Sequence, residues 1–472
     1  MTLRLIFMRL LKLLGASLIL ALMATGCAPN PSKSDVGIQL FMYNWKSVAK
    51  ECEQSLGPAG LAWVLVSPPQ EHIVQDQWWV HFQPVSYKLE SRLGTRGDFK
   101  EMIDTCNKSG VKVIADAVIN HMAGSSSGTG WAGSAYEKYN YPGIYESSDF
   151  HNCGLTNNNQ IANFADRIQV QTCELLGLSD LDTGSEKVRA QISAYLRDLL
   201  SLGVAGFRID AAKHISAEDL ASILRELPKE TLIFQEVIRG AGEQVQPEEY
   251  IATGKLWEFE FSNLVTSLDL GVVPNLGEAK SFANFLPSQS AISFVTNHDT
   301  ERNGKALTQR YSPEAFELAT LFMLASDYGT PMLYSGYFFD EYDQPPPLDN
   351  AGNVLDADCS QTEIWHCQQR SQTIIAMLKW RSEVNLEKIE NFYYDEVFSA
   401  WDRGDRGLFA INASLSPQIR TVRTSLPPGA YCNLLELAPA ESTCAGNEIT
   451  VESDGLVELE LGPMKSLALL QN

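Results

Sequence analysis

The stretch Val111-Lys-Val-Ile-Ala-Asp116-Ala-Val-Ile-Asn120-His121 decides the fold, because a run of strand-forming residues leads directly into polar side chains. The pattern recurs three times further along the chain. A polar group at the end of an apolar strand, repeated in order, is typical of the carboxyl edge of a parallel β/α barrel, where such barrels carry their chemistry. The later copies are Gly203-Val-Ala-Gly-Phe-Arg208-Ile-Asp210-Ala-Ala-Lys213-His214, Thr231-Leu-Ile-Phe-Gln-Glu236-Val237 and Ala291-Ile-Ser-Phe-Val-Thr-Asn297-His298-Asp299.

Four further runs have the length and composition of barrel strands, and helical patterns separate them. The expected strands are Gly37–Tyr43, Leu61–Ser67, Leu256–Phe261 and Thr330–Tyr334, and the expected helices include Phe99–Ser109 and Glu186–Leu202. Together with the four segments above, they predict an α/β fold, a (β/α)8 TIM barrel.

Two stretches interrupt this alternation. Residues 122–178 are rich in Gly, Ser and Asn and too long for an ordinary βα loop, which predicts an irregular B domain inserted after strand 3. From residue 391 to 472, short alternating runs such as Gly407–Asn412 lie between turn residues. This pattern predicts a C-terminal antiparallel β-sandwich. The barrel would then comprise residues 37–121 and 179–390.

The first 27 residues are predicted to be a leader rather than part of the fold. Arg4, Arg9 and Lys12 precede an apolar run from Leu13 to Thr25, which is too short to span a bilayer and is typical of a secretory signal. Ala24-Thr-Gly-Cys27 resembles the bacterial lipoprotein cleavage signal, which implies a lipidated Cys27 followed by a tether at 28–36. The alternative is ordinary signal cleavage nearby, with Cys27 incidental.

The charge balance limits the partners. The 472-residue chain has a net charge of −22, and the leader contains three basic and no acidic residues, so the remainder carries −25. Such acidity argues against nucleic acid or an anionic membrane surface as a partner. It is compatible with a neutral substrate and with an exported body that contacts a membrane only through a lipidated Cys27.

Eight cysteines remain after Cys27, and an even count in an exported chain predicts disulfides, although about 105 pairings are possible. Three sequence intervals are short, namely Cys153 to Cys173, Cys359 to Cys367 and Cys432 to Cys444, which leaves Cys52 and Cys106. The sequence contains no CxxC motif or histidine-rich cluster that would indicate zinc.

Taken together, these motifs resemble the α-amylase family of glycoside hydrolases (family 13), and most closely its animal-type members and their bacterial relatives. Trp78-Trp79-Val-His-Phe82-Gln83-Pro-Val-Ser-Tyr87-Lys88-Leu and Asp116-Ala-Val-Ile-Asn-His-Met-Ala-Gly124 carry the likeness, which extends from about Gly37 to the C-terminus. The resemblance implies the disulfides Cys52–Cys106, Cys153–Cys173, Cys359–Cys367 and Cys432–Cys444. It also implies a monomeric, exported enzyme that cuts internal α-1,4 bonds of starch and related α-glucans with retention of configuration.

The resemblance assigns a role to each carboxylate. Asp210 would be the nucleophile and Glu236 the general acid and base, as a retaining mechanism requires. Asp299 would bind sugar hydroxyls and help to distort the ring. Each residue alone has a simpler reading, since an Asp after a strand is usually a cap or turn residue and a lone Glu a solvated charge. Four motifs in order make those simpler readings much weaker.

Further residues are expected to bind the substrate. The aromatic side chains would stack on the apolar faces of sugars, and Phe82 stands where the family usually has tyrosine. Arg208 would also keep Asp210 ionised. Lys213 and His214 would contact sugars beyond the cleavage point. The full set is Trp78, Trp79, Phe82, Gln83, His121, Arg208, Lys213, His214 and His298.

Two ions follow from the same resemblance. A structural Ca²⁺ would bind side-chain oxygens of Asn120 and Asp180 and main-chain oxygens of Gln171 and His214, a hard oxygen set that suits this ion. The simpler reading of Asp180 is a cap for the following helix. Chloride is expected to bind weakly or not at all. Arg208 and Asn297 match the family's chloride ligands, but Met332 replaces its second cation.

Other functions use the same residues. A maltooligosaccharide-forming or transglycosylating enzyme would carry the same carboxylates, and only its products would differ. A glucan-binding surface lipoprotein without catalysis is a further alternative, but such relatives typically lose the carboxylates that are present here. Thr300–Lys305 stands where the family has a glycine-rich mobile loop, so closure of the cleft is not predicted from the likeness.

Overall fold

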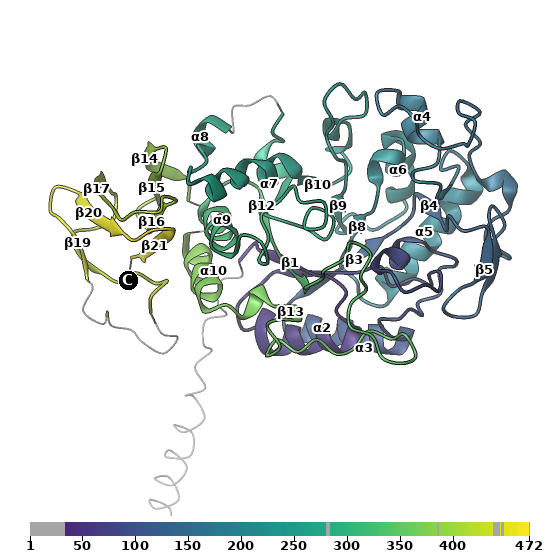
Figure 1. The fold of residues 1–472 in the computed structure, drawn as a ribbon, viewed down its shortest axis with the longest axis horizontal. Helices are drawn as coiled ribbons and strands as arrows, with labels where there is room; N and C mark the ends of the chain where they lie inside the picture. The colour runs from purple at the N-terminus through teal and green to yellow at the C-terminus, as the bar shows by residue number, and fades with distance from the viewer. Residues whose placement is uncertain (1–33, 280–283, 385–386, 438–443, 445–447, 472) are drawn as a thin grey trace, which may run out of the picture. The chain divides into compact units, whose positions relative to one another are not determined.

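The computed structural model describes residues 34–279, 284–384, 387–437, 444 and 448–471 (Figure 1). The expected leader, the expected lipidation site Cys27 and most of the expected tether therefore lie outside the described residues. Within the described part of the chain, no helix has the length and hydropathy needed to cross a membrane.

Eight parallel strands form a closed barrel, as predicted. Strand β12 pairs with β1 through the register Ile38↔Leu333, and this pairing closes the ring. Six of the eight strands are buried along almost their entire length because helices and loops cover the outer face, which favours continuous apolar runs. The strands are β1 (Gly37–Leu40), β2 (Trp63–Val66), β3 (Lys112–Ala117), β8 (Gly206–Ile209), β9 (Leu232–Gln235), β10 (Lys255–Glu258), β11 (Ala291–Phe294) and β12 (Thr330–Tyr337).

Helices connect consecutive barrel strands (Figure 1). Helix α3 begins at a capping box in which Thr95 and Asp98 each accept a main-chain N–H of the other, which satisfies donors that the first turn leaves free. The α-helices are α2 (Trp45–Glu51), α3 (Arg96–Lys108), α4 (Arg167–Thr172), α5 (Glu186–Ser201), α6 (Ala217–Leu224), α7 (Phe259–Val265), α8 (Leu276–Ala279), α9 (Pro313–Ala325) and α10 (Gln372–Val384).

One local prediction was wrong. The alternating stretch Leu256–Phe261 is not one strand, because β10 ends at Glu258 and α7 begins at Phe259. The Glu258 carboxylate accepts the main-chain N–H of Glu260 at 3.1 Å, and this cap starts the helix despite the alternating pattern. Trp78 and Trp79 lie in the 3₁₀ helix η2 (Trp78–Phe82), after β2.

The segment between β3 and β8 is irregular, as predicted. Its first and last strands, β4 (His121–Met122) and β7 (Ser179–Asp180), pair antiparallel with the register His121↔Asp180. Between them lie β5 (Ser127–Thr129), β6 (Ala135–Glu137), the 3₁₀ helix η3 (Ser147–Asp149) and α4. The segment therefore leaves and re-enters the barrel at a single strand pair beside the carboxyl edge.

The C-terminal strands form two four-stranded antiparallel sheets, ordered β14-β15-β16-β21 and β17-β20-β19-β18. Side chains from both sheets, such as Phe398 and Leu408 from one and Val457 and Leu459 from the other, share one buried core. This packing is the predicted β-sandwich. The strands are β14 (Ile389–Asp395), β15 (Phe398–Arg403), β16 (Gly407–Asn412), β17 (Gln418–Arg423), β18 (Gly429–Tyr431), β19 (Ile449–Val451), β20 (Leu456–Leu461) and β21 (Lys465–Leu470).

The four disulfides implied by the resemblance are all present. The bonds are Cys52–Cys106, Cys153–Cys173, Cys359–Cys367 and Cys432–Cys444. Four structural disulfides are typical of proteins that fold in an oxidising compartment outside the cytosol.

Candidate active site

The carboxyl edge of the barrel carries a cleft of about 390 Å³. Asp210 follows β8, Glu236 follows β9 and Asp299 follows β11, so three strand ends bring the predicted carboxylates into one cleft. Its lining consists of Trp78, Trp79, Phe82, Gln83, His121, Leu175, Leu176, Leu178, Asp210, Ala211, Glu236, His298, Asp299 and Tyr342.

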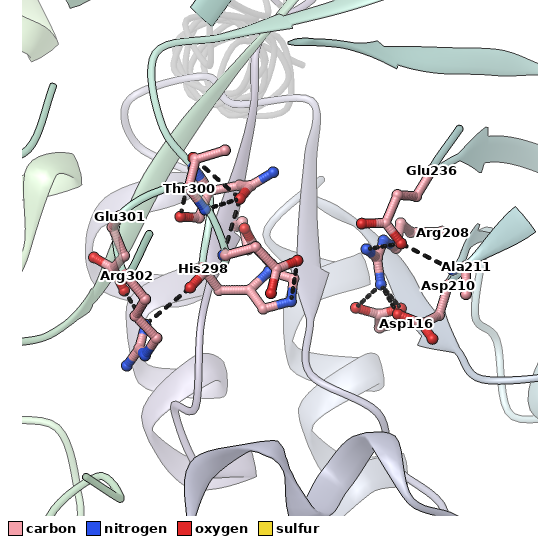
Figure 2. Close-up of polar contacts among 12 residues, drawn as sticks. Asp116, Arg208, Asp210, Ala211, Glu236, His298, Thr300, Glu301 and Arg302 are labelled. Carbon is pink, nitrogen blue, oxygen red and sulfur yellow. Dashed lines mark hydrogen bonds and ion pairs between the residues drawn. The ribbon is translucent and has the colours of Figure 1, made fainter. Parts of the chain in front are cut away.

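Arg208 lies at the centre of the acidic cluster, with its side chain fully buried (Figure 2). Its Nη1 lies 2.6 Å from Asp210 and 2.9 Å from Asp116, and its Nη2 lies 2.8 Å from Glu236. The indole of Trp257 covers the guanidinium, with Cζ 4.5 Å from the ring centroid. Because Asp210 and Glu236 contact the same guanidinium, the width of that group limits their separation.

The electrostatics of the cluster favour retention of protons. Burial raises the pKa of Asp210, of Glu236 and of Asp299 above the ordinary carboxyl value, while the charge of Arg208 opposes that rise at all three. Asp116 shows the same balance, with a strongly raised pKa. One cation therefore serves several buried carboxylates, and an arrangement of this kind keeps a carboxyl group protonated near neutral pH.

The turn after Asp210 has an unusual main-chain conformation that serves Glu236. Ala211 has a φ of 48°, which lies in the left-handed region that residues other than glycine rarely adopt. In this conformation its N–H donates to Glu236 Oε2 at 2.8 Å. Strain of this type is typical of functional sites, and here it fixes one oxygen of the carboxyl group.

His298 lies between aromatic rings beside Asp299. Its imidazole stacks on Phe82 and Phe41, at ring-centroid distances of 5.1 and 4.8 Å. Burial lowers the pKa of His298 well below its usual value, so the ring is neutral. Gln39 Nε2 lies 3.1 Å from Nδ1, and donation from this amide would leave the imidazole proton on Nε2, which is 3.4 Å from Asp299.

Asn297 shapes the turn that carries Asp299. Its side-chain oxygen accepts the main-chain N–H groups of Asp299 at 2.9 Å and of Thr300 at 2.8 Å. This Asx-type turn fixes the direction in which Asp299 leaves β11.

The aromatic residues that the sequence indicated all line the cleft, although from a 3₁₀ helix. Trp78 is almost completely buried, whereas Trp79 and Phe82 are partly exposed. Trp78 Nε1 donates to the main-chain oxygen of Tyr342 and Trp79 Nε1 to the Asp343 carboxylate, both at 2.8 Å. The indoles are therefore held by the loop that follows β12.

Three of the polar residues expected to bind substrate have other partners or lie outside the lining of the cleft. His121 lines the cleft, but its Nε2 is 2.9 Å from the main-chain oxygen of Phe82, and burial lowers its pKa to about 4. Lys213 and His214 are buried and do not contribute to the lining. Lys213 Nζ donates to Ile238 O at 2.7 Å and to the carboxylate of Glu243.

The expected calcium ligands lie in two places next to the inserted segment: Asn120 lies beside Asp180, and His214 lies beside α4, which contains Gln171. Asn120 Nδ2 lies 3.3 Å from Asp180 Oδ1, and both side chains are buried. His214 Nδ1 is 2.9 Å from the main-chain oxygen of Val170, the neighbour of Gln171. Carboxylate, amide and main-chain oxygens fit Ca²⁺. Burial raises the pKa of Asp180 to about 7, although His151, whose Nδ1 lies 2.7 Å from Asp180 Oδ2, opposes that rise. Among the described residues, no cluster of three His, Cys, Asp or Glu could hold a metal without such main-chain oxygens.

The expected chloride ligands have free donors but lack the second cation. Within the described part of the chain, Arg208 Nε and Asn297 Nδ2 are buried without a hydrogen-bond partner, which fits an anion. Met332, however, packs in an apolar cluster with Trp257 and Phe294. The site therefore offers an anion one arginine that several carboxylates already neutralise.

Several residues of the site were missed by the sequence analysis. Asp116 was quoted within a motif without a role. Tyr342 belongs to a loop without a recognisable pattern, and Arg302 to the segment Thr300–Lys305, which stands in place of the family's glycine-rich loop. Asp116 could have been predicted as a partner of Arg208, because it lies near the end of the strand that precedes the Arg208 strand in the barrel. The cleft-lining residues without such a signal are Leu175, Leu176, Leu178 and Tyr342.

A closed parallel barrel that places three carboxylates in a cleft at its carboxyl edge defines a barrel enzyme of the glycoside hydrolase class. Comparison with known proteins gives the family. The description "Alpha amylase, catalytic domain" matches residues 84–258, and "Alpha amylase, C-terminal all-beta domain" matches residues 395–472. The chain belongs to the α-amylase family of glycoside hydrolases.

Full-length similarities agree with this assignment. An α-amylase of Streptomyces violaceus is 43% identical over 462 residues, which cover 96% of this chain and 77% of the relative. An α-amylase of Thermomonospora curvata is 40% identical, with coverage of 93% and 74%. A structure of a variant α-amylase I from Eisenia fetida in complex with maltohexaose superimposes with a TM-score of 0.87 at 30% identity, covering 94% of this chain and 98% of that one.

Proposed function

We propose that the chain is an α-amylase that hydrolyses internal α-1,4-glucosidic bonds of starch and related α-glucans with retention of configuration. The observation that carries this proposal is the pair Asp210 and Glu236, which contact one buried guanidinium at the base of an open cleft. A retaining enzyme needs two carboxyl groups about 5–5.5 Å apart, one to attack and one to transfer protons.

In the first step, an Asp210 oxygen bonds to the anomeric carbon while the bond from that carbon to the leaving sugar's oxygen breaks. Glu236 gives its proton to the leaving oxygen, which becomes a hydroxyl group. In the second step, the Glu236 carboxylate takes a proton from water, the water oxygen bonds to the anomeric carbon, and the ester to Asp210 breaks. Both side chains return to their starting protonation states.

The surrounding residues support these steps. Burial raises the pKa of both carboxyl groups and the charge of Arg208 opposes the rise at both, but a hydrogen bond from Arg208 lowers the pKa of Asp210 further, whereas the charge of Asp210 raises that of Glu236. Ionised Asp210 beside protonated Glu236 would therefore be the favoured arrangement before the first step. Asp299 and the N–H of neutral His298 would bind hydroxyl groups of the reacting sugar. These contacts would strengthen as positive charge develops at the anomeric carbon.

Further contacts would hold the rest of the glucan. Trp78, Trp79 and Phe82 would offer apolar ring surface to sugars, with Gln83 and His121 beside them. Lys213 and His214 would act on the leaving-sugar side, because the Lys213 main-chain N–H donates to Glu236 O at 3.2 Å. Since their side chains lie outside the lining of the cleft, these two contacts would need a substrate that extends beyond it.

For the ions, we propose that Asn120 and Asp180 side chains with Gln171 and His214 main-chain oxygens hold a structural Ca²⁺. When bound, the ion would tie the inserted segment to the barrel and neutralise Asp180. Chloride would bind weakly or not at all, because Met332 provides no charge. Activity that is unchanged between chloride and acetate salts at equal ionic strength would support this.

We also propose the domain boundaries, the oligomeric state and the cellular location of the chain. Residues 37–121 and 179–390 would be the catalytic barrel, 122–178 the B domain and 391–472 the C-terminal domain of a monomer. Export would follow from the 1–27 leader, with a lipid on Cys27 as the only membrane contact and 28–36 as its tether. A Cys27→Ser variant that leaves the membrane fraction for the soluble fraction of the cell envelope would support lipidation, and unchanged partition would contradict it.

The decisive experiment measures reducing-end release from soluble starch by residues 28–472 with Ca²⁺. Rapid loss of polymer size with mixed short products is expected, and Asp210→Asn should reduce the rate by at least about a thousandfold. Asp104→Asn, an exposed change on α3, is the matched control and should be fully active. Folded wild type that binds starch without releasing reducing ends would favour the binding lipoprotein, and products longer than a maltotriose substrate would favour a transglycosylase.

A further inference from the structure

We propose that Tyr342 is an additional sugar-binding residue, which stacks on a glucose unit on the non-reducing side of the bond that is cleaved. This inference rests on the proposed hydrolysis of α-glucans and extends it by one binding position. Tyr342 lines the same cleft as Asp210, Glu236 and Asp299. It is 56% exposed there, whereas a tyrosine that serves only the core would be buried.

The main chain beneath Tyr342 is fixed. Its carbonyl oxygen accepts the Trp78 indole N–H, and the carboxylate of the next residue, Asp343, accepts that of Trp79, both at 2.8 Å. The Tyr337 hydroxyl donates to Gln344 O at 2.7 Å. These three hydrogen bonds hold the segment that carries the exposed ring before a ligand arrives, and such pre-organisation reduces the entropic cost of binding.

The neighbours of Tyr342 place it on one side of the reaction centre. Its ring lies edge-to-face with Trp78 at 6.1 Å, and Trp78 in turn lies 6.0 Å from the imidazole of His298. In Figure 2 the group around His298 is separate from the group around Glu236. Glu236, which protonates the leaving oxygen, faces the leaving sugar. Because Asp299 and His298 would bind the reacting sugar, which stays on the enzyme, Tyr342 lies on the side of the sugar that stays.

The chemistry of the ring suits this position. The face of a glucose unit presents C–H groups, and these pack against the negative face of an aromatic ring. The hydroxyl group of Tyr342 is not needed for stacking. Removal of the ring should therefore weaken the binding of long oligosaccharides, while Phe at this position should preserve it.

The test measures the binding of maltohexaose by calorimetry in an inactive Glu236→Gln background, so that it does not depend on turnover. Addition of Tyr342→Ala should raise the Kd about threefold to tenfold, and Tyr342→Phe should leave it within about twofold. Tyr311→Ala is the matched control, because Tyr311 is 70% exposed and lies outside the cleft lining. It should not change the Kd.

The same substitution in the active enzyme gives a second readout. The ratio of kcat/KM for maltohexaose to that for maltotriose should fall, because only the longer chain reaches the extra position. An unchanged Kd for the Tyr342→Ala variant would overturn the proposal, as would an equal loss for both substrate lengths. Neither result would affect the proposed hydrolysis, which fails separately if the wild type releases no reducing ends from starch.

Discussion

Asp116 and Arg208 are register partners on the neighbouring parallel strands β3 and β8, and their side chains form a fully buried ion pair at 2.9 Å. The pairing of the strands therefore determines which carboxylate neutralises the arginine beneath the catalytic pair. Asp116 shares Arg208 with Asp210 and Glu236 and competes with them for its charge.

The first prediction concerns Asp116→Asn. Loss of one negative charge leaves Arg208 more fully available to Asp210 and Glu236, which lowers the pKa of both groups. Ionised Asp210 and protonated Glu236 are needed together, so the bell-shaped pH profile of kcat/KM should move to lower pH by about one unit. Initial rates on a soluble oligosaccharide between pH 4 and 9 would measure this. A shift of the kcat/KM profile to higher pH would contradict the competition of Asp116 with Asp210 and Glu236 for Arg208.

The second prediction concerns Arg302, whose side chain is fully buried and whose Cζ lies 4.1 Å from the ring centroid of Phe339. Nη1 donates to His298 O at 3.0 Å and pairs with Glu301. Arg302→Met should lower the free energy of unfolding by about 3–5 kcal/mol, because it leaves Glu301 buried without its partner. Denaturant titration would measure the loss. The double variant with Glu301→Gln should recover part of it, and an equal loss in both would refute the pairing.

The third prediction uses the pH dependence of Glu301. Burial raises its pKa to about 7, against the opposing effects of Arg302 and Tyr334. A group whose pKa is higher in the folded than in the unfolded state contributes stability at low pH, and this contribution disappears as pH rises through the folded value. Between pH 5 and 8, wild type should therefore lose stability relative to Glu301→Gln, by on the order of 2–3 kcal/mol. Unfolding curves at both pH values would measure this. An equal change in unfolding free energy for the two proteins would disprove the prediction.

The fourth prediction concerns metal removal. Excess EDTA should lower the Tm by about 2–5 °C, because an ion that binds only the folded state stabilises it by mass action. Added Ca²⁺ should restore the Tm and added Mg²⁺ should not, since the smaller ion retains its water. Asp180→Asn should abolish the response, whereas Glu137→Gln, an exposed change on β6, should keep it. A chelator response that survives in Asp180→Asn would place the ion elsewhere.

Much of the barrel could be predicted because short local sequence patterns identify its strands. Apolar runs that end in Asp116, Asp210, Glu236 and Asp299 predicted the closed barrel, and the last three of these carboxylates share the cleft. The disulfide pairs required the family resemblance, because the count alone allowed many pairings.

The remaining features depend on contacts that no local pattern encodes. Tyr342 and Arg302 reach the site through loops that follow β12 and β11, and the aromatic rings beside them, Trp78 and Phe339, belong to other segments of the chain. The error at Phe259 has a local cause, since a cap from Glu258 outweighed strand alternation. The 3₁₀ helix at Trp78 was not predicted, because its few residues leave no periodicity to detect.

The pairing of β4 with β7 has an evolutionary consequence. Because residues 123–178 begin and end at one strand pair, their length and sequence can change without shifting the register of β3 against β8. Natural variation there would remodel Leu175, Leu176 and Leu178 at the mouth of the cleft while the reacting groups keep their places. Sequence changes within this segment could therefore give relatives of this chain a different preference among glucans. The positions of Asp210 and Glu236 would not change.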